Sequence, residues 1–297
     1  NIENKINHGL LKLEKKIKKL QTKHYNLFGN TTYLGIMPDW NPAEIIGIKP
    51  KALSTSLYKE LITDKIWAEN RGDYGFKYVK SNQLMTDFLG TPFIDVRVDF
   101  NSWIPKNLNN KLTNKLINYY LSLFKKNKHL HDKIEFEILY TCFTPSTSKR
   151  LIQLKKSYFD SKEINSFSNS LKNINIIAIK NINREIEKIK VLKNKQNTIQ
   201  KKNIYPIEKI YWLIQDCKNY GTSCFAGFAR CGFIGIELLN SFVNEKIISR
   251  EEKKEFLSSI NSITSKMIID LDKDKKKLIE LYGHLRPNTY DICSKNY

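Results

Sequence analysis

Most short motifs that identify catalytic or metal-binding proteins are missing from this sequence. It contains no Walker phosphate loop, no GxGxxG fingerprint, no GxSxG elbow and no HExxH zinc motif. The five cysteines form no CxxC pair, and their odd number argues against a disulfide framework. Cys217, Cys224 and Cys231 recur every seven residues, a wider spacing than metal ligands prefer. We therefore expect reduced core thiols, no metal site and a cytoplasmic location.

Long uncharged hydrophobic segments are also missing, and no signal peptide is visible. The stretch YGTSCFAGFARCGFIGIELL comes closest to a membrane span, but Arg230 interrupts it. Its small residues favour a closely packed buried helix, in which Arg230 needs either an acidic partner or a cleft. We expect no membrane association.

Acidic residues are few, at 30 against 50 basic ones, which gives a formal net charge of +20. Such an excess is typical of nucleic-acid-binding proteins. The lysines are spread among asparagines and isoleucines, however, and form no arginine-rich arm or aromatic-interleaved stripe. We interpret the charge as compositional, so nucleic acid is not the expected partner. A basic helical nucleic-acid-binding module stays as the alternative from another functional class.

Hydrophobic periodicity predicts an α+β protein, with a mainly helical body and a small antiparallel sheet. Residues 93–100 and 133–141 alternate apolar and polar side chains, as strands with one buried face do. Helical spacing is seen at 9–23, at 109–127 and in most of the chain after 160. We expect a flexible connection at 190–203 and one long helix from about Arg250 to beyond Leu271. The whole chain, 1–297, is predicted to be a single domain, with 1–160 and 161–297 as subdomains.

The segment MPDWNPAEIIG, residues 37–47, combines a helix start with two residues that capping does not explain. Asn41 suits the N-cap position, Pro42 the first helical position, and Glu44 the third position of a capping box. Asp39 and Trp40 lie just before this helix, whose free N–H groups attract anions. They form either a ligand loop or a rigid corner with Trp40 packed inward.

Two further groups of charged side chains are candidates for binding. Asp95, Arg97 and Asp99 are predicted to share one strand face, where Arg97 can hold a carboxylate and an aspartate an ammonium group. The alternative is a solvated face with Arg97 paired to Glu135 or Glu137. His284, Arg286, Tyr290 and Asp291 are concentrated in YGHLRPNTYDI, a predicted loop. They form either a set of donors at a cleft or a corner closed by Arg286 and Asp291.

Four segments together resemble the central substrate-binding region of PEP-synthase-like dikinases: MPDWNPAEIIG, TPFIDVRVDFNSWIP, GTSCFAGFARCGFIGIELLNSFV and YGHLRPNTYDI. The relevant branch includes rifampin phosphotransferase and the L-glutamine kinase of capsular phosphoramidate biosynthesis, to which the resemblance is greatest. It extends from about Leu34 to Ile292. The ATP-grasp signatures and the segment with the mobile phosphohistidine are missing here.

The resemblance implies an acceptor domain excised from a longer ATP-dependent kinase and inactive alone. In such enzymes an ATP-grasp domain phosphorylates a histidine on a mobile domain, which then donates the phosphoryl group, giving AMP and phosphate. We expect transfer to the side-chain amide nitrogen of L-glutamine. The alternative acceptors are pyruvate, a sugar or an antibiotic. ATP and Mg²⁺ would be used by the full-length enzyme and not bound by this domain.

The resemblance also suggests roles for the candidate residues. A carboxylate would orient the amide nitrogen or accept its proton, and an arginine would stabilise charge on the transferring phosphoryl group. The expected catalytic residues are Asp39, Arg97 and Arg286. The expected substrate-binding residues are Trp40, Asp95, Asp99, Arg230, His284, Tyr290 and Asp291.

Overall fold

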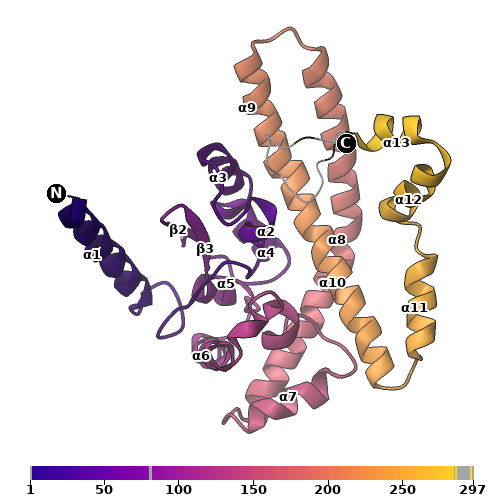
Figure 1. Ribbon diagram of the computed structural model, residues 1–297. Helices are drawn as coiled ribbons and strands as arrows, with labels where there is room; N and C mark the ends of the chain where they lie inside the picture. The colour runs from indigo at the N-terminus through magenta and orange to yellow at the C-terminus, as the bar shows by residue number, and fades with distance from the viewer. Residues whose placement is uncertain (1, 80–81, 284, 286–294, 296–297) are drawn as a thin grey trace.

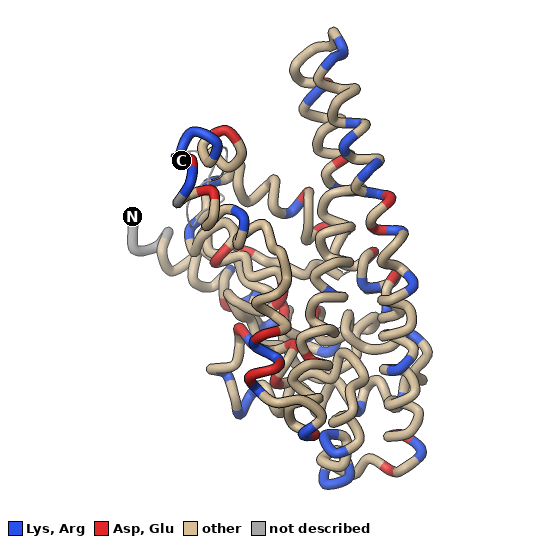
Figure 2. The backbone as a smooth tube through the Cα atoms, turned by 90° about the vertical axis from the view of Figure 1, so that its right-hand side faces the viewer, with Lys and Arg blue, Asp and Glu red and all other residues tan. Residues whose placement is uncertain are grey.

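The computed structural model describes residues 2–79, 82–283, 285 and 295 (Figure 1). Helices make up most of this part of the chain, and its three strands form one antiparallel sheet. The predicted fold class, a mainly helical α+β protein, is therefore confirmed. Figure 2 shows Lys and Arg recurring along the whole molecule rather than on one element.

The N-terminal part contains the sheet and a set of short helices. Strand order is β1–β3–β2, with Leu34 opposite Asp95 and Met85 opposite Ile94. The elements up to β3 are α1 (Ile2–Gln21), β1 (Leu34–Gly35), α2 (Pro42–Ile45), α3 (Ala52–Tyr58), the π-helical turn η1 (Lys59–Thr63), α4 (Ile66–Asp73), β2 (Met85–Phe88) and β3 (Thr91–Asp95).

The main hydrophobic core lies where four helices meet: α5 (Val96–Ser102), α6 (Asn110–Lys126), α7 (Thr147–Lys155) and the first turns of α8 (Ser161–Lys201). Phe100, Leu116 and Leu151 are buried there, and each such side chain contributes about 1.5–3 kcal/mol. A smaller apolar cluster around Trp67 and Ile94 joins the sheet to α3 and α4. The elements after β3 are α5 (Val96–Ser102), α6 (Asn110–Lys126), the 3₁₀ turn η2 (Lys128–Leu130), the π-helical turn η3 (Ile134–Ile138) and α7 (Thr147–Lys155).

Both predicted strand segments are corrected by the structure. β3 ends at Asp95, whose carboxylate accepts hydrogen bonds from the backbone N–H groups of Arg97 and Val98 at 3.0 and 3.1 Å. This N-cap begins α5, so the alternating pattern of 93–100 is split between a strand and a helix. Residues 134–138 form η3 instead of a strand. A strand would place Ile134, Phe136 and Ile138 on one face, whereas in η3 the two isoleucines are buried and Phe136 is only partly buried.

The C-terminal part is helical throughout its described residues. α8 (Ser161–Lys201) begins at a capping box formed by Asp160 and Glu163 and runs for 41 residues. α9 (Pro206–Asp216), the π-helical turn η4 (Cys217–Thr222) and α10 (Ser223–Asn244) return along it (Figure 1). The predicted flexible connection at 190–203 is wrong. Its residues up to Lys201 are helical, and Lys195 pairs with Asp216 of α9 at 3.0 Å.

The predicted long helix after Arg250 is divided into three helices: α11 (Arg250–Ser259), α12 (Ile263–Lys273) and α13 (Lys275–Tyr282). The first break occurs because the hydroxyl of Ser262 accepts a hydrogen bond from the backbone N–H of Ser265 at 3.0 Å. That bond begins a new helix instead of continuing the old one. The proposed subdomains at 1–160 and 161–297 stay a prediction.

One helical stretch, Pro206–Asn244, is long and apolar enough to cross a membrane by length and composition, with a mean hydropathy of 1.3 over an 18-residue window. Core helices of soluble proteins pass the same test, so this is weak evidence for a membrane span. Arg230, near the middle of α10, is buried.

Candidate functional site

A cavity of about 210 Å³ lies between the loop before α2, the end of α5, and η3. Ligand sites for drug-sized molecules have about 300–1,000 Å³, so this cavity suits a small metabolite. Its walls include Asp39, Trp40 and Asn41 of the loop, Asp99 and Trp103 at α5, Glu135 and Phe136 of η3, and Phe233 of α10.

The loop that forms one wall has an unusual backbone. Asp39, Trp40 and Asn41 have φ angles of 20°, 56° and 34°, in a region that non-glycine residues rarely adopt. Two contacts hold this conformation. The Asn41 side chain accepts a hydrogen bond from the Glu44 N–H at 3.1 Å, and the Tyr58 hydroxyl donates to the Trp40 carbonyl at 2.6 Å. The predicted cap at Asn41 is confirmed, and three successive strained residues are typical of a functional loop.

Two ion pairs lie against the ring of Trp103. Arg71 of α4 donates to Asp39 at 2.8 Å, and its guanidinium carbon is 3.2 Å from the centroid of that ring. Arg230 of α10 pairs with Glu135, and its guanidinium carbon is 5.2 Å from the same centroid. The paired side chains are nearly buried, with exposed fractions of 9% for Arg71, 11% for Asp39, 2% for Arg230 and 16% for Glu135. Segments far apart in the sequence therefore meet in one charged cluster.

Asp99 is the least satisfied member of this cluster. Its exposed fraction is 0%, and neither of its carboxylate oxygens has a hydrogen-bond partner among the described residues. Oδ2 of Asp39 also lacks a partner within that part of the chain. Burial raises the pKa of Asp99 well above its usual range; the nearby Asp39 raises it further, and Arg71 only partly opposes this. These surroundings therefore favour the neutral form of the Asp99 carboxyl group.

Glu135 is affected by the same environment. Burial raises the pKa of Glu135, while the positive charges of Arg230 and Arg71 lower it in part. The cavity lining thus has four carboxyl groups, those of Asp39, Asp99, Asp132 and Glu135, and two of them are paired with the guanidinium groups of Arg71 and Arg230. Unpaired carboxyl oxygens in a buried site require hydrogen-bond donors, which a ligand can supply.

The raised pKa of Asp99 predicts how stability depends on pH. The unfolded chain releases this proton near pH 3.9 and the folded chain only at higher pH, so folding takes up a proton between these values. Within that range, each rise of one pH unit removes up to about 1.4 kcal/mol from the free energy of unfolding. Asp99→Asn should therefore gain stability relative to the natural chain as the pH rises above about 4. Urea unfolding of both proteins at several pH values measures this, and a pH-independent difference would contradict it.

Four of the predicted site residues come together here. Asp39, Trp40 and Asp99 line the cavity, and Arg230 reaches it through its pair with Glu135. For Trp40, both alternatives hold in part: its ring lines the cavity and also lies 6.2 Å from that of Phe225.

The shared face predicted for Asp95, Arg97 and Asp99 is wrong, because the helix that starts after Asp95 turns Arg97 and Asp99 about 200° apart. The guanidinium of Arg97 donates to the carbonyls of Thr22 and Leu20 at 2.8 and 2.9 Å, at the C-terminal end of α1. Neither Arg97 nor Asp95 lines the cavity, and the alternative pairing of Arg97 with Glu135 is replaced by that of Arg230. The structure thus gives both residues roles in folding: Arg97 caps α1 and Asp95 caps α5.

The remaining predicted residues, His284, Arg286, Tyr290 and Asp291, lie outside the described residues. Their roles stay predictions. Three residues of the cluster were missed: Arg71, Trp103 and Glu135. Trp103 stands in a segment that carries the resemblance, and Glu135 appeared only as a strand partner. Arg71 lies in α4, a helix with no pattern that sets it apart.

The described residues contain no group of three or more His, Cys, Asp or Glu side chains arranged to hold a metal ion. The four cysteines in this part of the chain are free, and Cys142 and Cys224 are buried.

No family model, no curated protein and no solved structure matches this chain.

Proposed function

We propose that this chain is the acceptor domain of a PEP-synthase-like phosphotransferase and that its cavity receives a small amide, L-glutamine being the best candidate. One observation carries the proposal. Three of the four segments that resemble this class supply the charged cluster. The first provides Asp39 and Trp40, the second Asp99 and Trp103, and the third Arg230. These residues are far apart in the sequence, so their convergence is not a consequence of local structure.

The chemistry of the cavity favours an amide over the other acceptors. The unpaired oxygens of Asp39 and Asp99 need hydrogen-bond donors, and the side-chain amide of glutamine offers two N–H groups to one such pair. Pyruvate offers only acceptors and would add a net negative charge beside four carboxyl groups, whereas glutamine is a zwitterion without net charge. An antibiotic is too large for about 210 Å³. A sugar hydroxyl is a donor, but each hydroxyl offers a single O–H.

The same arrangement suggests how transfer would proceed. A phosphohistidine delivered by another domain would meet the amide nitrogen, which forms an N–P bond as the bond from phosphorus to imidazole breaks and its electron pair returns to the ring. The amide nitrogen is a poor nucleophile, so a carboxylate must accept its proton as the bond forms. Asp39 is the carboxylate paired with Arg71, and Asp99 lies beside it.

The proposal requires an ATP-grasp domain and a mobile phosphohistidine domain as partners, in the cytoplasm where ATP is present. The cavity itself does not fit ATP, because its four carboxyl groups outnumber the two guanidinium groups paired with them and would repel a triphosphate. ATP and Mg²⁺ therefore belong to the partner domain in this proposal.

Isothermal titration of the chain with L-glutamine, L-glutamate and pyruvate tests the proposal. We expect heat of binding with L-glutamine and at least tenfold weaker binding of L-glutamate, which replaces two N–H donors with a negative charge. Asp64→Asn, at an exposed position away from the cavity, serves as a control that should bind like the natural chain. Binding of pyruvate without binding of L-glutamine would overturn the choice of acceptor.

A further inference from the structure

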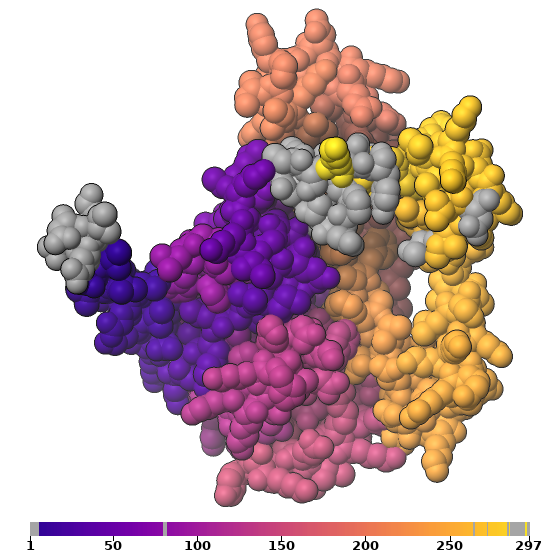
Figure 3. Space-filling view, viewed as in Figure 1, coloured from indigo at the N-terminus to yellow at the C-terminus, as the bar shows by residue number. Residues whose placement is uncertain are grey.

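A second and larger cavity, of about 700 Å³, lies between α11, the end of α10 and the start of α7. Figure 3 shows α11 as part of an arm beside the body, with a gap between the two. The two cavities share only Phe136 among their lining residues, and the phosphotransferase proposal makes no use of the second.

The side of α11 that faces this cavity is basic. Arg250, Lys253, Lys254 and Leu257 line the space and are spaced three, four and seven residues from Arg250, so they share one helix face. In most helices the face turned toward the neighbouring helix is apolar and packs against it. Here it places three positive charges opposite α10 instead, so the helix and the body are separated by a polar space.

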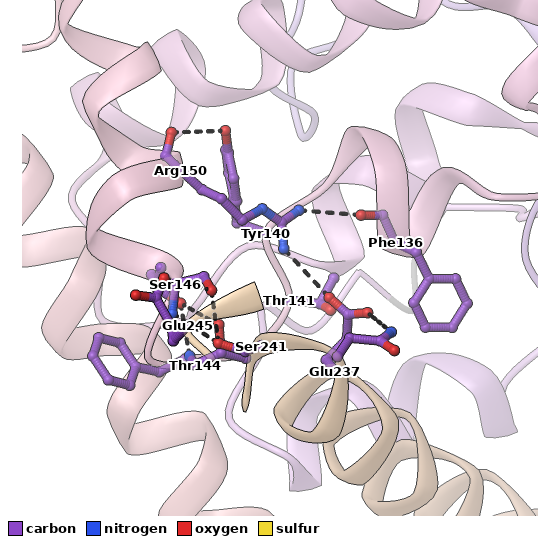
Figure 4. A network of polar contacts seen from close by, with 12 residues as sticks. Phe136, Tyr140, Thr141, Thr144, Ser146, Arg150, Glu237, Ser241 and Glu245 are labelled. Carbon is purple, nitrogen blue, oxygen red and sulfur yellow. Dashed lines mark hydrogen bonds and ion pairs between the residues drawn. The ribbon is translucent and has the colours of Figure 1, made fainter. Parts of the chain in front are cut away.

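The opposite wall consists mainly of neutral side chains, with one ion pair and one further acidic residue, Glu137. Figure 4 shows Ser146 and Ser241 joined at 2.8 Å, and Arg150 paired with Glu237 at 3.3 Å. Because Arg150 and Glu237 neutralise each other, Glu137 carries the remaining charge of this wall. The serine, threonine and asparagine side chains of the wall are suited to hydroxyl and amide contacts.

The charge balance of the whole cavity favours an anion. Apart from the Arg150–Glu237 pair, the lining has three basic side chains and one acidic one, Glu137. The Lys253 ammonium donates to the side-chain oxygen of Asn240, whereas the side chains of Arg250 and Lys254 have no hydrogen-bond or ion-pair partner among the described residues. A guanidinium and two ammonium groups on one helix face match the oxygens of a phosphate group.

We propose that this cavity binds a small phosphorylated molecule. Its phosphate would be held by Arg250, Lys253 and Lys254, and its polar remainder would contact Ser146 and Ser241. A volume of about 700 Å³ lies within the usual range of small-molecule sites, about 300–1,000 Å³. The shared chemistry, a phosphate next to hydroxyl groups, fits a phosphate ester and also free diphosphate.

Isothermal titration at constant ionic strength with glucose 6-phosphate and with inorganic pyrophosphate tests this site. Arg250→Ala/Lys254→Ala removes two charges from exposed helix positions and should weaken binding of the tighter ligand at least tenfold. Lys193→Ala/Lys201→Ala removes the same net charge from exposed positions of α8 and should leave binding unchanged. Tighter binding of glucose 6-phosphate would identify a phosphate ester as the ligand, and tighter binding of pyrophosphate a free diphosphate.

Equal weakening in both double variants, or no binding of either compound by the natural chain, would overturn the proposal. Circular dichroism spectra and melting temperatures of both variants show whether they fold. Titration of the same variants with L-glutamine separates the two proposals, since neither variant touches the cavity that contains Asp99. Weaker phosphate binding by Arg250→Ala/Lys254→Ala, with unchanged binding by Lys193→Ala/Lys201→Ala, would support the second site whether or not L-glutamine binds.

Discussion

Arg230→Ala is expected to lower the free energy of unfolding by about 3 kcal/mol. Removing one partner of a buried ion pair leaves the other charge without compensation, at a cost of about 3–5 kcal/mol. The lower end applies because the Glu135 side chain keeps an exposed fraction of 16%. The substitution also removes the contact between the guanidinium and Trp103 and a 3.3 Å hydrogen bond to Thr141. Urea unfolding near pH 7 measures the change.

Two comparisons make this prediction specific. Lys149→Ala breaks an ion pair with Glu245 in which the lysine is 71% exposed, and it should cost less than about 1 kcal/mol. Glu135→Gln combined with Arg230→Ala should recover part of the loss, because no buried charge is then left unpaired. Equal effects of Arg230→Ala and Lys149→Ala would mean that the cluster is not a buried ion-pair site.

Asp39→Asn is expected to lower the rate of amide phosphorylation by about 10²–10⁴-fold in the complete phosphotransferase. This is the usual contribution of a positioned general base, and an amide side chain cannot accept the proton. The change preserves the size of the side chain and its oxygen acceptor for Arg71. KM for L-glutamine should change much less than kcat, because the main loss is in the transition state. Phosphorus NMR of the N-phosphorylated product gives the initial rates.

Asp64→Asn is the matched control for this experiment, since it makes the same substitution at an exposed position. It should leave both kcat and KM unchanged. A reduction of less than about threefold in kcat for Asp39→Asn would show that Asp39 does not accept the proton. Asp99→Asn would then be the next substitution to compare, because Asp99 shares the cavity and lies beside Asp39.

Some features that depend only on neighbouring residues, such as a helix cap and an amphipathic helix, were predicted correctly from the sequence. The cap at Asn41 and the helix at 109–127 depend on neighbouring residues, and both are found. The pattern of 93–100 misled because Asp95 begins a helix by accepting two backbone hydrogen bonds, which alternation of apolar residues does not reveal. In a strand Arg97 and Asp99 would share one face, whereas in α5 they point in different directions. Their contacts therefore differ from the predicted ones.

Contacts between distant segments were harder to predict for a different reason. Arg230 needs a partner when buried, and this much follows from its apolar surroundings in the sequence. Which acid fills that role depends on how α10 lies against η3, and this is decided by packing across 95 residues of sequence separation. Arg71 could not be identified as the partner of Asp39, since no pattern in α4 links the two.

A crystal structure of the chain with bound L-glutamine is the most direct test of the central claim, that Asp39 and Asp99 receive the amide group of a small acceptor. We predict electron density for the side-chain amide in the 210 Å³ cavity, with its nitrogen about 2.7–3.2 Å from an oxygen of Asp39 or Asp99. Glutamine bound elsewhere, or in this cavity with both carboxyl groups beyond hydrogen-bond distance of its amide, would contradict the account.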